Sequence, residues 1–234
     1  MKIFKRIVAA TMTLCMGIGL CGCSGKQDAQ NKSYDIKHGD EQYFVMNHYQ
    51  TGGGALLDME YTADQAIILD NDNGNLKYLS GTSDSDIWDE TIIDDIDENK
   101  DKAYISAGCI DTDGTAYSAV YNYEMKNNEM VDGSTEIRRY DMSAGQKSMT
   151  EHEVIMENID LNITGMYHSK EEDSYYFLTS DGLFKYDSTG KQVAEYDESG
   201  CRNFAVADKV YLLADQKMVE LDNDLNVISE SSEI

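Results

Sequence analysis

The chain has 234 residues, 44 of them Asp or Glu and 19 Lys or Arg, which gives a formal net charge of −25. Such a surface is repelled by nucleic-acid phosphates and by anionic lipid head groups, which argues against a nucleic-acid partner, and it attracts cationic ligands. Hydrophobic residues make up 41% of the chain, enough for a folded core. The 16 tyrosines, against five phenylalanines and no proline, favour sheets with half-exposed faces.

The first 22 residues have the pattern of a secretory leader. Lys2, Lys5 and Arg6 form a positive start, and an apolar run follows from Ile7 to Leu20. The run is shorter than the roughly 20 apolar residues of a membrane-spanning helix, which disfavours the alternative of a retained anchor. The sequence therefore predicts a signal peptide at residues 1–22, removed from the mature protein.

The end of this leader reads Leu20-Cys21-Gly22-Cys23 and resembles the lipobox of bacterial lipoproteins. Cys21 departs from the pattern, because Ala, Ser or Thr is commoner at the second position. The resemblance implies that Cys23 becomes the new N-terminus and carries diacylglycerol, with a third acyl chain on its amine in some bacteria. Two or three chains at about 0.8 kcal/mol per buried CH₂ anchor a protein stably. We expect a protein lipid-anchored to the outer face of the cell membrane.

A polar segment follows Cys23. Residues 24–40 contain almost no large apolar group, a composition typical of a flexible tether. We therefore divide the chain into the signal peptide at 1–22, the lipidated cysteine with its tether at 23–41, and one folded domain at 42–234.

Short runs rich in Tyr, Val, Ile and Leu predict strands throughout the folded domain. The first sheet is expected to use residues 42–47, 55–61, 65–69 and 75–79, with a hairpin turn at Asp70–Gly74, where Asn-Gly supplies positive φ. The acidic segment 80–101 predicts an edge strand or a helical turn, and 125–134 an exposed loop. Further strands are predicted at 102–107, 115–124, 135–140, 152–157, 162–167, 175–196 (a run of strands), 202–206, 210–214, 218–221 and 226–229.

Part of this strand pattern repeats. When Tyr176 is aligned with Tyr211, each copy contains an apolar strand, a tight turn, a second strand ending in Asp, and another turn. A repeat of short strands predicts a propeller or a solenoid of sheets. Residues 175–178 are apolar on both faces, as expected of a strand between two neighbouring sheets.

The turn after each repeated strand resembles the blades of PQQ-like and WD40-like β-propellers. Residues 187–191 (DSTGK) carry the resemblance best, and 141–146 and 222–226 carry it more loosely. The resemblance implies an all-β fold of about four four-stranded antiparallel blades, forming a small, open or incomplete ring. It implies no catalytic residue and no cofactor, since the tryptophan docking motif of PQQ-type blades is missing and Trp88 lies in an acidic segment.

The sequence marks no catalytic or metal site. The turns containing Asp70 and Asp111 resemble fragments of Ca²⁺ loops, but Leu69 and Cys109 occupy the first ligand position, so both predict hairpin turns. Cys109 and Cys201 remain after the leader and are expected as buried free thiols rather than a disulfide. The four histidines are dispersed and have no nucleophile beside them.

These observations favour a binding or interaction protein of the bacterial cell envelope, a scaffold or sensor with a protein or glycan ligand. The alternatives are a hydrolase or lyase acting on envelope or other polysaccharide, and the N-terminal propeller of a longer transporter-associated lipoprotein. Aromatic residues are candidates for stacking on a glycan or peptide, with blade core as the alternative role; they are Tyr43, Tyr49, Trp88, Tyr121, Tyr123, Tyr167 and Tyr175.

Overall fold

The computed structural model describes residues 36–38, 41–43, 55–61, 65–82, 89–127, 129–142 and 152–231. Strands dominate these residues, and the one helix among them is the single turn α2 (Glu98–Asp101). In the described part of the chain, no helix has the length and apolar character needed to cross a membrane. The predicted signal peptide and Cys23 lie outside the described residues.

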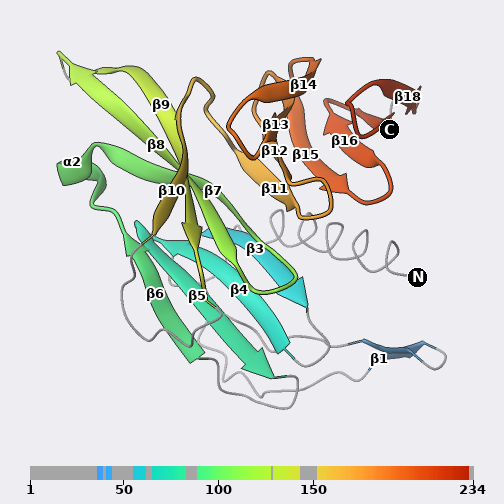
Figure 1. The fold of residues 1–234 in the computed structure, drawn as a ribbon, viewed down its shortest axis with the longest axis horizontal. Coiled ribbons are helices and arrows are strands. Elements are labelled where there is room, and N and C mark those ends of the chain that lie inside the picture. The colour runs from blue at the N-terminus through green and yellow to red at the C-terminus, as the bar shows by residue number, and fades with distance from the viewer. Residues whose placement is uncertain are drawn as a thin grey trace, which may run out of the picture.

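Four four-stranded antiparallel sheets form the blades of a β-propeller, which confirms the predicted fold class. In each blade the strands follow one another in chain order (Figure 1). Blade 1 contains β3 (Ala55–Tyr61), β4 (Gln65–Asp72), β5 (Asn75–Thr82) and β6 (Asp89–Asp95). Blade 2 contains β7 (Ala103–Ile110), β8 (Ala116–Lys126), β9 (Glu129–Tyr140) and β10 (Glu153–Ile159).

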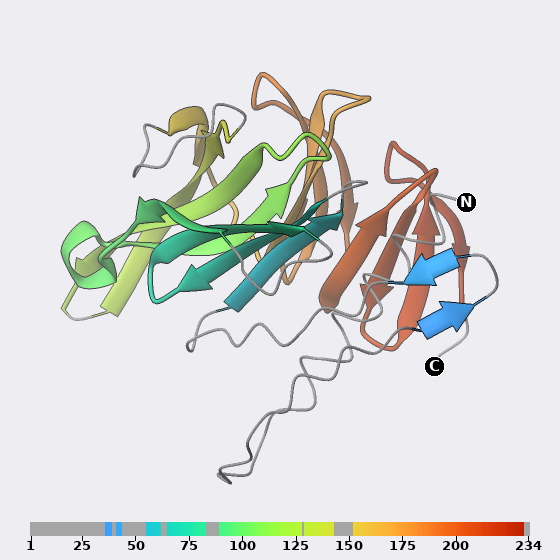
Figure 2. The ribbon, with the colours of Figure 1, turned by 90° about the horizontal axis from the view of Figure 1, so that it is seen from below.

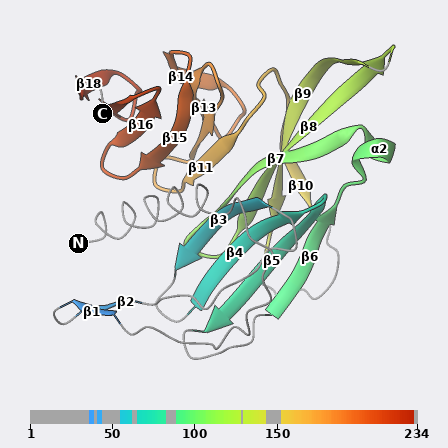
Figure 3. The same ribbon diagram turned by 180° about the vertical axis from the view of Figure 1, so that it is seen from behind.

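Blades 3 and 4 come from the repeated part of the sequence. Blade 3 contains β11 (Gly165–Ser169), β12 (Ser174–Leu178), β13 (Gly182–Asp187) and β14 (Gln192–Asp197). Blade 4 contains β15 (Cys201–Val206), β16 (Val210–Ala214), β17 (Lys217–Leu221) and β18 (Val227–Glu230). The four sheets succeed one another around an arc with blades 1 and 4 at its ends, as Figures 2 and 3 show from two further sides.

The prediction for blade 1 was wrong by one strand. Residues 42–47 were expected as its first strand, but β2 (Glu41–Tyr43) pairs with β1 (Ile36–His38) in a separate two-stranded sheet. The fourth strand of blade 1 is instead β6, from the acidic segment 80–101. This outer strand buries only Ile93, so its sequence has little of the apolar alternation that marks an inner strand.

The predicted loop at 125–134 is also wrong, because β8 and β9 continue through it as one long hairpin. Met125 pairs with Met130 near the tip, where both side chains are about half exposed. The hairpin projects beyond the rest of blade 2 (Figure 1). This part of the hairpin has no neighbouring sheet to pack against among the described residues, so it carries polar residues, and their pattern is typical of a loop.

Each interface between consecutive blades, here called a seam, holds one apolar cluster. In β12, Tyr175 and Phe177 pack into the seam with blade 2, whereas Tyr176 and Leu178 pack into the seam with blade 4. Successive side chains of a strand point to opposite faces, so a strand between two seams must be apolar at every position. The two-sided apolar pattern predicted from residues 175–178 is therefore confirmed.

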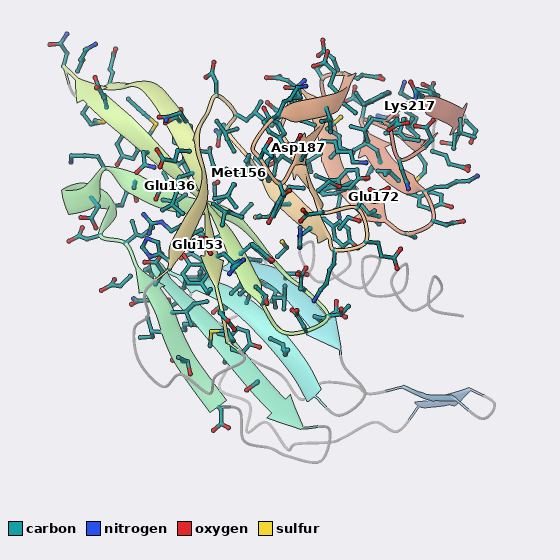
Figure 4. The ribbon with its side chains drawn as sticks, viewed as in Figure 1. Glu136, Glu153, Met156, Glu172, Asp187 and Lys217 are labelled. Atoms are coloured by element: carbon teal, nitrogen blue, oxygen red, sulfur yellow. The ribbon has the colours of Figure 1, made fainter. Side chains whose placement is uncertain are left out.

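Polar contacts close the seams at their edges. Between blades 1 and 2, one carboxylate oxygen of Asp94 accepts hydrogen bonds from Arg138 Nη1 at 2.7 Å and from the Tyr140 hydroxyl at 2.5 Å. Arg138 is also held by Glu136, whose Oε1 lies 2.7 Å from Nε (Figure 4). Such charge-assisted bonds fix the angle between two sheets as well as adding stability.

The seam between blades 3 and 4 has an equivalent contact centred on Glu172, which Figure 4 shows at the junction of the two blades. Its carboxylate accepts from Lys185 Nζ at 3.0 Å and from the Tyr176 hydroxyl at 2.9 Å. Asn223 of blade 4 donates to the second carboxylate oxygen at 2.8 Å. Burial raises the pKa of Glu172, but the bonds from Lys185 and Tyr176 outweigh it and leave the pKa below its usual value.

The seams predict a clear difference between buried and outer positions of blade 3. Phe177→Ala should lower the free energy of unfolding by about 3–5 kcal/mol, because it opens a cavity in a fully buried seam. Val193→Ala, at a position in β14 that is 51% exposed, should change it by less than about 0.5 kcal/mol. Urea denaturation of both variants measures the difference, and equal effects would contradict the seam assignment.

Candidate functional site

A polar cleft of about 330 Å³ lies at the seam between blades 2 and 3. A wider depression of about 500 Å³ on blade 4 has no buried side chain among its lining residues Arg202, Asp215, Gln216 and Lys217. The cleft at the seam differs because buried polar side chains contribute to its wall, and we take it as the candidate site. Its lining residues are Asp111, Asp113, Thr115, Tyr117, Arg139, Asp141, His168, Lys170, Asp173 and Tyr175.

The cleft begins at the turn Asp111–Thr115, between β7 and β8. The same turn geometry recurs at Asp187–Lys191 and Asp222–Asn226: the first residue donates its amide to the carbonyl of the fifth, and the fourth donates to the carbonyl of the first. The fourth residue has positive φ in all three turns, as this kind of hairpin turn requires; the residues are Gly114, Gly190 and Leu225.

The first aspartate of these turns is used in two different ways. Asp187 and Asp222 cap their own turns, each accepting from the backbone amides two and four residues further on. In the cleft turn Asp113 takes over this role and accepts from the Thr115 amide at 3.1 Å. The carboxylate of Asp111 is thereby released from its turn and points across the seam.

Across the seam, Asp111 meets His168 of β11. The imidazole Nδ1 lies 3.0 and 2.9 Å from the two carboxylate oxygens, and the Tyr117 hydroxyl donates to one of them at 3.3 Å. The side chains of Asp111 and His168 are each only 7% exposed. Because a carboxylate can only accept, Nδ1 carries a proton. The tautomer of His168 is thus set by a residue of the neighbouring blade.

Aromatic rings enclose this pair. The His168 ring stacks on Tyr175 with centroids 4.4 Å apart, and Tyr117 lies 5.0 Å away on a tilt. Burial, followed by the charge of Asp111, raises the pKa of Tyr117, and burial raises the pKa of Tyr175 to about 12. Both phenols therefore keep their protons near neutral pH, and the Tyr117 hydroxyl donates its proton to Asp111.

Ion pairs form the outer rim of the cleft. The ammonium of Lys170 binds Asp113 across the seam, and this bond from Lys170 is the main reason that the pKa of Asp113 falls to about 2. Arg139 lies 3.1 Å from Glu153 of β10, which is labelled in Figure 4. Since these pairs are exposed, they orient side chains more than they stabilise the fold.

One nitrogen of the site has no hydrogen-bond partner among the described residues. Nε2 of His168 is buried and makes no hydrogen bond within the part of the chain that the structure describes. No group of three or more His, Cys, Asp or Glu side chains in that same part is arranged to hold a metal ion. A buried polar atom without a partner normally costs about 1–3 kcal/mol, which a ligand or an ordered water recovers.

Of the aromatic residues proposed from the sequence, Tyr175 alone lines the cleft among those whose side chains are described. Tyr121 and Tyr123 pack against Tyr104 on the long hairpin of blade 2. Tyr167 packs on the apolar cluster of the seam between blades 3 and 4. Cys109 and Cys201 are both buried and free, as predicted. The side chains of Tyr43, Tyr49 and Trp88 lie outside the described residues.

Sequence reasoning missed the central pair of the site. Asp111 was assigned to turn chemistry, and His168 was set aside because no nucleophile stands beside it. The two residues are 57 positions apart and come together only when blades 2 and 3 pack. The second aspartate of the turn, Asp113, gives no usable signal, because Asp224 stands at the same position of the Asp222 turn and Asp222 still caps that turn.

Solved structures resemble this chain in fold, whereas no protein-family profile and no curated protein matches it. A protein of unknown function from Bacteroides caccae aligns with a TM-score of 0.51 and 12% identity over 80% of this chain and 64% of its own. Regucalcin, a calcium-binding protein from Agrobacterium tumefaciens, gives 0.46 and 11% over 74% and 58%. The extracellular domain of a putative one-component system from B. thetaiotaomicron gives 0.45 and 15% over 83% and 24%.

This chain therefore spans less than two thirds of the length of each of these three proteins. At such identities the similarity concerns the fold alone and transfers no residue role. The assignment of the blades to the PQQ-like or WD40-like type stays a prediction. What the cleft can bind has to be argued from its own side chains.

The rim yields a prediction about protonation. Lys170→Ala should raise the pKa of Asp113 from about 2 towards the ordinary aspartate value of about 3.9, because the main cause of the low value is removed. Asp113 stays ionised above either value, so the lost pair matters only as pH falls through that range. A carboxyl-detected NMR titration measures the shift, and an unchanged pKa would contradict the ion pair.

Proposed function

We propose that this protein is a lipid-anchored binding protein on the outer face of a bacterial cell membrane, and that its ligand occupies the cleft between blades 2 and 3. The observation that carries the proposal is the buried Asp111–His168 pair, whose second imidazole nitrogen has no partner among the described residues. A buried polar pair at the wall of an open cleft costs stability, which a binding function would explain.

The build of the cleft supports binding. Two blades supply its wall, so its shape is fixed by the packing of whole sheets and not by one loop. Its donors and acceptors come from strand ends and a tight turn, which hold side chains in place before a ligand arrives. Binding to a preformed site loses less conformational entropy than binding that must order the site.

The place of the protein in the cell rests on its N-terminus. A basic start, a short apolar run and the lipobox-like residues 20–23 support export followed by lipidation of Cys23. The polar residues 24–40 would then hold the propeller away from the membrane. In that position a protein or glycan of the envelope is a fitting ligand, whereas the net charge of −25 disfavours nucleic acid.

The anchor can be tested with two cysteine variants. Cys23→Ser should abolish incorporation of a palmitate analogue and release the protein from the membrane fraction, because the acceptor thiol is lost. Cys21→Ser is the matched control, since serine is common at that position of a lipobox, and it should still be labelled. Labelling that survives in Cys23→Ser would contradict the anchor at this residue.

Binding at the cleft can be tested on glycan and peptide arrays with the full mature protein. Ligands that bind should lose about tenfold or more in affinity with Asp111→Asn, which keeps the shape but removes the charge. Asp181→Asn removes an exposed carboxylate from blade 3, in the turn between β12 and β13, and should have no effect. Ligands equally affected by both variants, or by neither, would place the binding site elsewhere.

A further inference from the structure

The lining of the cleft holds more negative than positive groups. Four aspartates face two basic side chains, and both basic side chains already have acidic partners. Lys170 pairs with Asp113, and Arg139 pairs with Glu153. The buried carboxylate of Asp111 makes its hydrogen bonds to an imidazole and a phenol instead. The interior of the cleft favours a positive ligand group on charge alone.

His168 adds an acceptor to this negative wall. Its Nδ1 proton is committed to Asp111, so in the neutral imidazole the other nitrogen, Nε2, carries a lone pair. This nitrogen lacks a hydrogen-bond partner among the described residues, in a side chain more than nine-tenths buried. In the neutral imidazole it requires a donor. Because Nε2 is enclosed, a ligand donor reaches it only after side chains of the lining change rotamer.

The aromatic side chains of the cleft also favour a positively charged ligand group. The rings of Tyr117 and Tyr175 flank His168, and both residues line the cleft. The face of a phenol ring attracts a cation by its quadrupole, with about 0.5–2 kcal/mol depending on desolvation. The net charge of −25 of the whole chain also attracts a cation to the protein.

We propose that the ligand of this cleft presents an ammonium group, which donates to His168 Nε2 and compensates the charge of Asp111. The inference rests on the proposed binding function and names its ligand class. An ammonium has three donors and no acceptor, so every bond it makes in this lining is favourable. A neutral hydroxyl satisfies Nε2 without compensating the carboxylates, and an anionic group is repelled by them. An amino sugar and a lysine side chain are the two sources of such a group.

The experiment is an NMR titration of the full mature protein at neutral pH, observing the imidazole signals of its four histidines. His168→Gln assigns the signal of His168, and substitution of the other three assigns it by elimination if that variant does not fold. Glucosamine is compared with glucose and glucuronate. Nα-acetyl-lysine methylamide is compared with its norleucine analogue, which lacks the ammonium.

The proposal predicts that at least one ammonium probe shifts the His168 signal saturably, with at least about tenfold higher affinity than its neutral partner. The arm that responds identifies the source of the ammonium. Asp111→Asn should weaken this binding about tenfold, and Asp181→Asn should leave it unchanged. Glucose or glucuronate binding as tightly as glucosamine would overturn the ligand class and leave the binding function standing.

Two further results separate the inference from the function on which it rests. If no ammonium probe shifts His168 while array ligands still depend on Asp111, the ligand class is wrong and the cleft remains a binding site. If no probe shifts His168 and no array ligand depends on Asp111, both proposals fail together.

Discussion

The fold depends on the burial of sheets that are apolar on both faces. A strand such as β12 sends Tyr175 into one seam and Tyr176 into the other, so blade 3 cannot cover its own surface and requires a neighbour on each side. The apolar contact is not directional, and side-chain pairs at the seam edges set the geometry. Asp94 with Arg138 does so between blades 1 and 2, and Glu172 does so between blades 3 and 4.

The seam between blades 2 and 3 differs from the other two because it contains the cleft. Three turns share one backbone geometry, and in two of them the first aspartate caps its own turn. At Asp111 the capping role moves two residues along to Asp113, and the freed carboxylate crosses to His168. A structural residue of the repeat thus becomes a buried charge beside a cleft. The proposed ligand site needs no change in the blade architecture.

Features encoded by a local sequence pattern could be predicted, whereas features that form only when blades pack together could not. The strand Val210–Ala214 was predicted at its observed bounds, because apolar residues in a short run between polar turns reflect local burial. The outer strand β6 was not predicted as part of blade 1, since it buries one side chain. The Asp111–His168 pair was invisible because it forms between blades. Asp111 occupies the same position of the repeated turn as Asp187, whose carboxylate only caps its own turn, so the repeat predicted the same role for Asp111.

The central claim is that Asp111 fixes the proton on Nδ1 of His168 and leaves Nε2, beside the cleft, as an acceptor without a partner among the described residues. The nitrogen-15 spectrum of the imidazole at neutral pH tests this directly, because the chemical shifts of the two ring nitrogens report which one carries the proton. The account predicts that the neutral imidazole carries its proton on Nδ1, with this preference lost in Asp111→Ala. A neutral imidazole with its proton on Nε2 would contradict it.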